Sequence, residues 1–142
     1  MAATRRRSTD PMSILTTYVQ GVRTSDTKLL RSVFADDMEL VSCSVGRMKG
    51  GARIAKFYGK MLKQRGGATP TPGPFIRTGN MVAFEIDVRH GNEIHKVSDF
   101  FTFKNGKVQR LAVYQGPIRK VGEPLYDYTR KGEKAKKPRR AR

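Results

Sequence analysis

The chain has 142 residues, of which 37% are hydrophobic and 8% aromatic, and this size predicts one folded domain with a modest core. The only cysteine is Cys43, which excludes an intramolecular disulfide, and no stretch approaches the roughly 20 apolar residues that a membrane span needs. The formal net charge is +17, and residues 119–142 hold ten Lys and Arg against three acidic residues.

The N-terminal part of the chain shows helical periodicity. Asp10-Pro11 is typical of a helix start, because aspartate caps the first turn and proline fits the first helical position. Thr24-Ser25-Asp26 should end this helix and cap a second one. The predicted buried stripes are Ile14, Leu15, Tyr18, Val19 and Val22 in the first helix, and Leu29, Leu30, Val33 and Phe34 in the second.

The next segments predict a strand and a third helix, separated by loops. We expect a turn at Ala35–Asp37, a strand over Met38–Ser44 and a loop over Gly46–Gly51. Gly66–Pro74 contains three prolines, which remove backbone donors, and is predicted to be a loop or a lid. The third helix, between these loops, has a stripe made of Ile54, Phe57, Tyr58, Met61 and Leu62.

From Phe75 onward the pattern is that of strands joined by tight turns at Gly79-Asn80, Gly91-Asn92 and Asn105-Gly106. The predicted strands are Phe75–Thr78, Met81–His90, Glu93–Phe103 and Val108–Gln115. Three helices followed by an antiparallel meander indicate an α+β domain, with helices on one face of a bent sheet. We expect the domain to span residues 11–118, between a basic arm (1–10) and a basic tail (119–142).

One acidic side chain stands out in this pattern. Side chains alternate between the faces of a strand, so Asp99 shares a face with Val97, Phe101 and Phe103. If that face is buried, Asp99 needs either a partner or a proton, and desolvation should raise the pKa of its carboxyl. A salt bridge to an arginine or a buried backbone contact would also satisfy it.

Several local sequences resemble those of SnoaL-like and ketosteroid-isomerase-like domains of the nuclear transport factor 2-like superfamily. The similar segments are 18–26, 33–38, 50–58 and the hairpin 98–108. The resemblance implies a cone-shaped fold, with three N-terminal helices packed in the concave face of a strongly curved, mostly antiparallel sheet. It also implies a deep apolar pocket, although this architecture hosts enzymes and non-catalytic modules alike.

The resemblance also implies site residues. Tyr18 and Asp99 fall where the isomerases hold an oxyanion with a tyrosine and a protonated aspartic acid, an arrangement in which a carboxyl stays neutral in an apolar site. Tyr18 could equally be a core tyrosine with a satisfied hydroxyl. The ligand-binding residues expected around this pair are Phe34, Phe57, Met61, Phe84, His95, Phe101 and Tyr114.

The bases used by these families have no counterpart in the sequence. The isomerase base is a carboxylate on the first strand, where this chain has Ser42 or Cys43. The cyclases and epoxide hydrolases use an aspartate near the end of the last strand, where this chain has Gln115 and Gly116. Serine cannot accept a carbon-bound proton at neutral pH, and Cys43 is expected to be a small buried residue.

Two functions therefore remain open. The first is a pocket for a small apolar ligand that carries a carbonyl group or resembles a steroid or polyketide, in an isomerase or cyclase relative that has changed or lost its base. The second is a non-catalytic dimer formed through the outer sheet face, which includes Glu85, Asp87 and Arg89. No metal-ligand spacing or nucleotide motif appears, so neither reading involves a metal or cofactor.

The basic tail suggests a separate role. Lys136–Arg139 fits a simple nuclear-import pattern, and the tail could bind phosphates of a nucleic acid or another acidic partner without sequence specificity. We therefore expect an intracellular protein without membrane attachment, cytoplasmic or directed to the nucleus by this tail.

Overall fold

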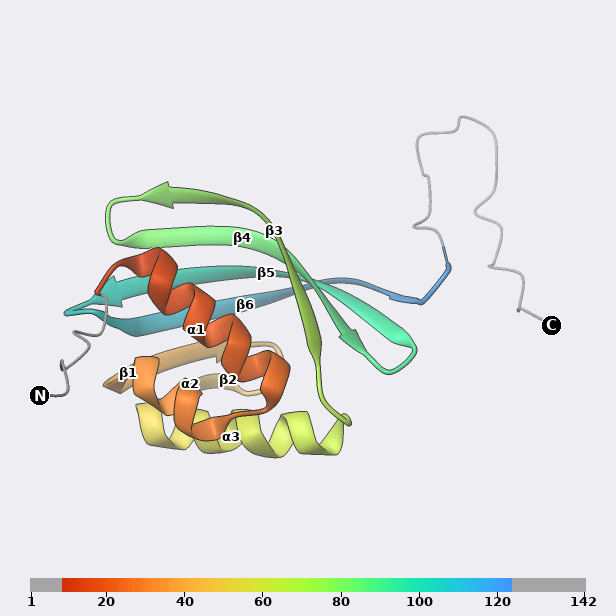
Figure 1. Cartoon of the computed structure of the whole chain (residues 1–142), viewed down its shortest axis with the longest axis horizontal. Coiled ribbons are helices and arrows are strands. Elements are labelled where there is room, and N and C mark those ends of the chain that lie inside the picture. Colours follow the sequence, from red (N-terminus) through yellow and green to blue (C-terminus); the bar gives the residue numbers. More distant parts are fainter. Residues whose placement is uncertain (1–8, 124–142) are drawn as a thin grey trace, which may run out of the picture.

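The computed structural model describes residues 9–123, which form a curled sheet wrapped around three helices (Figure 1). The helices are α1 (Pro11–Thr24), α2 (Thr27–Val33) and α3 (Gly51–Gln64). The strands are β1 (Phe34–Ser42), β2 (Gly46–Lys49), β3 (Thr69–Thr78), β4 (Met81–His90), β5 (Glu93–Lys104) and β6 (Lys107–Lys120). The three N-terminal helices and the mostly antiparallel, curved sheet confirm the predicted α+β cone.

Both ends of α1 and the start of α2 have the predicted capping residues. The side chain of Asp10 accepts a hydrogen bond from the Ser13 backbone nitrogen at 3.4 Å, and Pro11 opens α1. Ser25 ends α1 in the left-handed conformation, with φ at 53°. Asp26 then caps α2 by accepting from the Leu29 backbone nitrogen at 3.0 Å. Because these two caps are adjacent in sequence, α2 turns back against α1 without a longer connection.

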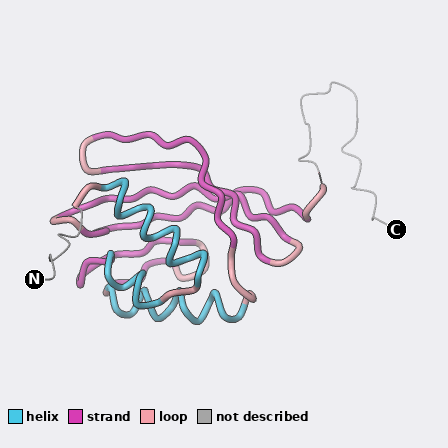
Figure 2. Tube along the Cα trace, in the orientation of Figure 1, coloured by secondary structure: helices cyan, strands magenta, loops and turns pink. Residues whose placement is uncertain are grey.

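The sheet order is β2-β1-β6-β5-β4-β3. Strands β3 to β6 form an antiparallel meander, and β1 joins it by pairing with β6 in parallel. The turn between β5 and β6 uses Asn105 and Gly106 with φ of 50° and 71°, as the Asn-Gly pair predicts. Figure 2 shows these long strands bending together across α1.

Three segments differ from the prediction. Ala35–Asp37 is not a turn, because β1 begins at Phe34 directly after α2. Gly46–Lys49 forms the short edge strand β2 instead of a loop. The proline-rich stretch 66–74 enters β3 at Thr69, and this strand lies at the edge of the sheet, where prolines are tolerated because one side of the strand has no hydrogen-bonding neighbour.

The core lies between the helices and the concave face of the sheet, and its centre is aromatic. Phe34 and Phe101 are 1% and 0% exposed. The ring of Tyr18 packs against both, at centroid distances of 6.2 Å and 5.1 Å. The alternation along β5 is as predicted, since Val97, Asp99, Phe101 and Phe103 are all buried.

The ends of the chain are largely outside the described residues. Strand β6 continues to Lys120, two residues past the predicted domain boundary at 118. Most of the basic N-terminal arm and the Lys131–Arg142 part of the tail lie outside the described range. Within 9–123, none of the helices is long and apolar enough to cross a membrane.

Candidate functional site

A cavity of about 120 Å³ lies between α1, α3 and the concave sheet face. Most of its wall is apolar, and its polar groups come from separate elements. The non-apolar side chains that line it are Tyr18, Ser42, Cys43, Ser44, Tyr58, Arg65, His90, His95, Asp99 and Gln115. The cavity is therefore an apolar pocket with a few convergent polar groups, which is the usual form of a small-molecule site.

Asp99 is the buried acid of this cavity. It lies in the middle of β5, between Phe84 of β4 and Val113 of β6 in the sheet register. The residue is 3% exposed, and its Oδ1 atom is buried without a hydrogen-bond partner among the described residues. Burial raises the pKa of Asp99 from 3.8 to about 7, so its carboxyl readily carries a proton. Neither an arginine nor a backbone group of the described chain reaches Oδ1.

Tyr18 and Tyr58 form a buried pair beside this acid. Their hydroxyl oxygens are 2.9 Å apart, although the residues are brought in by different helices, α1 and α3. Burial raises the pKa of both phenols, and the negative charge of an ionised Asp99 raises the pKa of each further. Both hydroxyls therefore stay protonated at neutral pH. Only one of them can donate to the other, so the pair keeps a hydroxyl hydrogen for a third acceptor.

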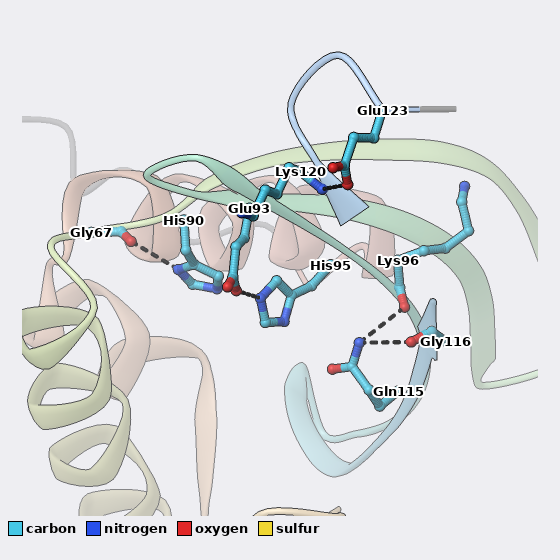
Figure 3. A network of polar contacts seen from close by, with 9 residues as sticks. All are labelled: Gly67, His90, Glu93, His95, Lys96, Gln115, Gly116, Lys120 and Glu123. Carbon is cyan, nitrogen blue, oxygen red and sulfur yellow. Dashed lines mark hydrogen bonds and ion pairs between the residues drawn. The ribbon is translucent and has the colours of Figure 1, made fainter. Parts of the chain in front are cut away.

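Two histidines form a second polar group of the cavity wall (Figure 3). The His90 Nδ1 atom lies 2.9 Å from the Gly67 carbonyl oxygen, and the His95 Nε2 atom lies 2.9 Å from Glu93 Oε2. The two imidazole rings meet edge to face at 5.2 Å. Burial lowers the pKa of His90, which favours its neutral form. Among residues 9–123, no three His, Cys, Asp or Glu side chains are arranged to hold a metal ion.

The positions at which the resemblance in sequence implies a base also lie on the cavity. Ser42, Cys43 and Gln115 all line it, and Cys43 is exposed instead of buried as expected, because it follows the end of β1. Asp99 is the only carboxyl group among the described lining residues. The cavity thus has hydrogen-bond donors at its inner end and no second carboxylate facing them.

The structure separates the predicted ligand-binding residues into two groups. Phe57, Met61 and His95 line the cavity together with Tyr18 and Asp99. The other four do not line it. Phe34 and Phe101 lie behind Tyr18 in the core, Phe84 lines a separate groove between α1 and β3, and Tyr114 is 55% exposed on the outer sheet face. Tyr114 is turned away because its strand neighbours Val113 and Gln115 face the cavity.

Sequence reasoning missed Tyr58, His90 and Arg65 as lining residues. Tyr58 was visible only as one member of an apolar helical stripe, and nothing in the sequence indicates its contact with Tyr18, 40 positions away. His90 is the last residue of β4, and the carbonyl of Gly67, a residue that precedes β3, holds it at the cavity wall.

The profile of the SnoaL-like domain matches residues 15–111, which is most of the described chain and contains both tyrosines and Asp99. The chain belongs to the SnoaL-like domain family. No curated protein matches its sequence. Solved structures match it widely at low sequence identity, which establishes the fold and leaves the activity open.

Three solved structures illustrate the range of functions that accompany this SnoaL-like fold. An NTF2-like protein of unknown function from Cytophaga hutchinsonii has a TM-score of 0.67 and 15% identity, over 80% of this chain and 95% of that one. A candidate ketosteroid isomerase from Kribbella flavida has a TM-score of 0.64 and 16% identity, and the match covers 89% of this chain and 90% of that one. An LEH-like epoxide hydrolase from M. tuberculosis has a TM-score of 0.61 and 17% identity, and the match covers 72% of this chain and 80% of that one.

Proposed function

We propose that this SnoaL-like domain binds a small apolar ligand in the cavity through a carbonyl oxygen that accepts hydrogen bonds from Asp99 and Tyr18. The observation that carries the proposal is the unpartnered Oδ1 of Asp99. A buried polar group without a partner costs roughly 1–3 kcal/mol, and a ligand oxygen would remove that cost. The small-molecule enzymes named among the structural neighbours support a ligand of this kind.

The size of the cavity favours a ligand with one ring. An apolar protein cavity of about 150 Å³ accommodates benzene, and this one measures about 120 Å³. A steroid- or polyketide-like ligand would place one ring here and extend through the mouth past His90 and His95. The carbonyl oxygen would lie at the inner end, beside the hydroxyls of Tyr18 and Tyr58.

The test is the binding of acetophenone, a neutral single-ring ketone, measured by calorimetry at pH 5.5 and pH 8.5. If only the protonated acid binds, the affinity should fall by up to about 30-fold between these values, because the pKa of Asp99 is about 7. Asp99→Leu should bind roughly 10-fold more weakly at pH 5.5, since one hydrogen bond is lost.

Asp99→Asn is the matched control, because its amide still donates but cannot titrate. It should keep most of the affinity and lose the pH dependence that the Asp99 carboxyl causes. Equal affinity of the native protein and Asp99→Leu at pH 5.5 would remove Asp99 as a donor and refute the proposal.

A second function is favoured by the outer face of the sheet, where we propose contact with a second copy of the chain. Ile76, Phe100 and Tyr114 are 74%, 39% and 55% exposed. Ile76 of β3 and Phe100 of β5 both pair with Ala83 of β4, which lies between them, and Tyr114 of the adjacent β6 pairs with Ser98 of β5. The rings of Phe100 and Tyr114 touch edge to face at 5.6 Å. Such an exposed aromatic patch is typical of an interaction surface.

Binding of a nucleic acid or another acidic partner stays a prediction from the basic tail. Of that tail, only residues 119–123 are described; residues 119 and 120 end β6, and residues 121–123 follow it. The predicted nuclear-import pattern at Lys136–Arg139 lies outside them. The pocket and the dimer are therefore the functions that the described residues support.

A further inference from the structure

His95 has the geometry of a base held by a carboxylate. A carboxylate oxygen can only accept a hydrogen bond, so the 2.9 Å contact with Glu93 fixes the hydrogen of the neutral ring on Nε2. The lone pair is then on Nδ1, which makes no hydrogen bond with a described residue. The side chain is 11% exposed, whereas that of Glu93 is 55% exposed. The imidazole therefore lines the cavity while its partner remains in contact with solvent.

The second imidazole is held in the opposite tautomer. The Gly67 carbonyl can only accept, so His90 carries its hydrogen on Nδ1. Its edge-to-face contact with His95 at 5.2 Å packs one ring against the other. This packing and the Glu93 contact together limit rotation of the His95 ring. A catalytic base needs such a fixed orientation.

The distance along β5 determines what His95 could act on. His95 and Asp99 are four residues apart on one face, so their Cα atoms are separated by about 13 Å. Side chains converge on the concave face of a curved sheet, which brings the functional atoms closer than the backbone. If the base removed a proton directly from the carbon beside a carbonyl, the base nitrogen and the oxyanion donor atom would have to lie about 8 Å apart. If a water molecule stood between the base and the carbonyl carbon, the same two atoms could lie about 10 Å apart.

We propose that His95, positioned by Glu93, is the general base of a hydrolase site that cleaves small apolar esters or lactones in this cavity. The inference rests on the proposed function, because the ester carbonyl would occupy the carbonyl position at Asp99 and Tyr18. It gives the cavity the base that Ser42, Cys43 and Gln115 cannot supply. No group beyond these residues and water is required.

The reaction is balanced by one proton that His95 takes and returns. Nδ1 accepts a proton from water while the water oxygen forms a bond to the carbonyl carbon. The π electron pair of the carbonyl moves to its oxygen, which accepts hydrogen bonds from the Tyr18 hydroxyl and the protonated Asp99. The tetrahedral intermediate then collapses, the bond to the alkoxy oxygen breaks, and the imidazolium returns the proton to that leaving group.

The ionisable groups around His95 are identifiable in the structure. Arg65 after α3, His90 of β4 and Asp99 of β5 line the same cavity, and Glu93 holds the ring. Glu93 is a positioning residue, so its removal should lower kcat, and a side chain that still accepts from Nε2 should restore it.

The test uses hydrolysis of phenyl acetate by the full chain, followed as phenol release from pH 5 to 9, with acetophenone affinity measured in parallel. We expect kcat/KM to fall above about pH 7, where Asp99 loses the proton that it donates to the carbonyl oxygen, and ¹⁸O from labelled water to appear in the acetate. His95→Gln should lower kcat by at least about 100-fold, a far larger loss than any in the affinity for acetophenone, which should still bind measurably. Retained binding shows that the variant is folded, and the smaller His95→Asn serves if Gln disturbs the fold.

Glu93→Ala should lower kcat roughly 10-fold and leave KM unchanged, because the imidazole loses the contact that orients it. Glu93→Gln should restore most of the rate, because its amide oxygen can still accept from Nε2. The matched control is Glu85→Gln on the outer sheet face, where Glu85 lies 3.9 Å from Lys96, and this variant should behave as the native protein does.

Each outcome separates the two proposals. Acetophenone binding without hydrolysis, or hydrolysis that survives in His95→Gln, overturns the role of His95 and leaves the ligand site standing. Failure of the native protein to bind acetophenone refutes the ligand site and this inference with it. A native value of kcat in Glu93→Ala, or a loss that Glu93→Gln does not restore, overturns the positioning role of Glu93.

Discussion

The buried carboxyl of Asp99 lowers the stability of the folded state. The acid is 3% exposed, and burial raises its pKa to about 7. A hydrophobic residue at this place in β5 would avoid that cost. Residues that destabilise the fold without structural benefit are typical of functional sites, which is why Asp99 carries the proposed ligand contact.

This cost predicts how stability depends on pH. The folded pKa lies above the ordinary value of 3.8, so between these values the folded chain binds more protons than the unfolded one. The stability that the protonated Asp99 contributes to the free energy of unfolding is fully present below pH 3.8. It is lost as the pH rises, and the loss stops above about pH 7. Asp99→Asn cannot titrate, so its free energy of unfolding relative to the native protein should rise by about 3 kcal/mol between pH 4.5 and pH 8.

Urea unfolding of both proteins at the two pH values checks this prediction, and the difference between them cancels the titration of all other groups. A difference that does not change with pH would mean that Asp99 is ionised throughout the range.

The contact between helices α2 and α3 depends on a glycine. A Cβ atom at Gly59 would lie 2.6 Å from Thr27 Oγ1, so the two helices approach closely only because Gly59 has no side chain. This contact aligns α3, which carries Tyr58 on the same side as the cavity. Glycine lowers helix stability by about 1 kcal/mol relative to alanine, and the close packing compensates for that loss.

A double-mutant cycle tests this packing. Gly59→Ala should destabilise the native protein by about 1 kcal/mol, because overpacking against Thr27 outweighs the gain in helix propensity. In a Thr27→Ala background, which removes the hydroxyl, the same change should stabilise by about 0.5–1 kcal/mol. Urea unfolding of the four proteins measures both steps. Equal effects in the two backgrounds would show that the residues do not interact.

At the scale of the whole molecule, the sheet has two different faces. The concave face holds the cavity, and the outer face exposes Phe100 and Tyr114 beside the charged side chains of Glu85, Asp87 and Lys96. Lys96 lies 3.1 Å from Asp87 Oδ1, so these charges partly neutralise one another at the edge of the aromatic patch. A dimer formed there would leave the cavity accessible from the opposite side of the sheet.

The proposed dimer predicts a change in oligomeric state. Phe100→Glu with Tyr114→Glu should convert a dimer into a monomer in light scattering after gel filtration, because two charges would be buried in the contact. Val121→Glu replaces an exposed apolar residue outside the sheet face and should leave the dimer intact. The monomer should still bind acetophenone. A native protein that is monomeric at all concentrations would rule out this interface.

The sequence alone determined most of the fold, because its signals are local. Asp10 and Asp26 cap helices, Asn105-Gly106 adopts the positive φ of a tight turn, and alternation along β5 places Asp99 inward. Each feature depends on neighbours a few residues apart. The proline-rich start of β3 was misassigned, since only the sheet order reveals that this strand is an edge.

The tertiary structure decided the site, because its contacts join residues far apart in the chain. Tyr18 of α1 contacts Tyr58 of α3, and His90 is held by Gly67 from the connection between α3 and β3. The register of β6 turns Tyr114 outward. Local sequence indicates which side of an element is buried. It does not indicate which buried residues are neighbours, and that depends on how the curled sheet closes around the helices.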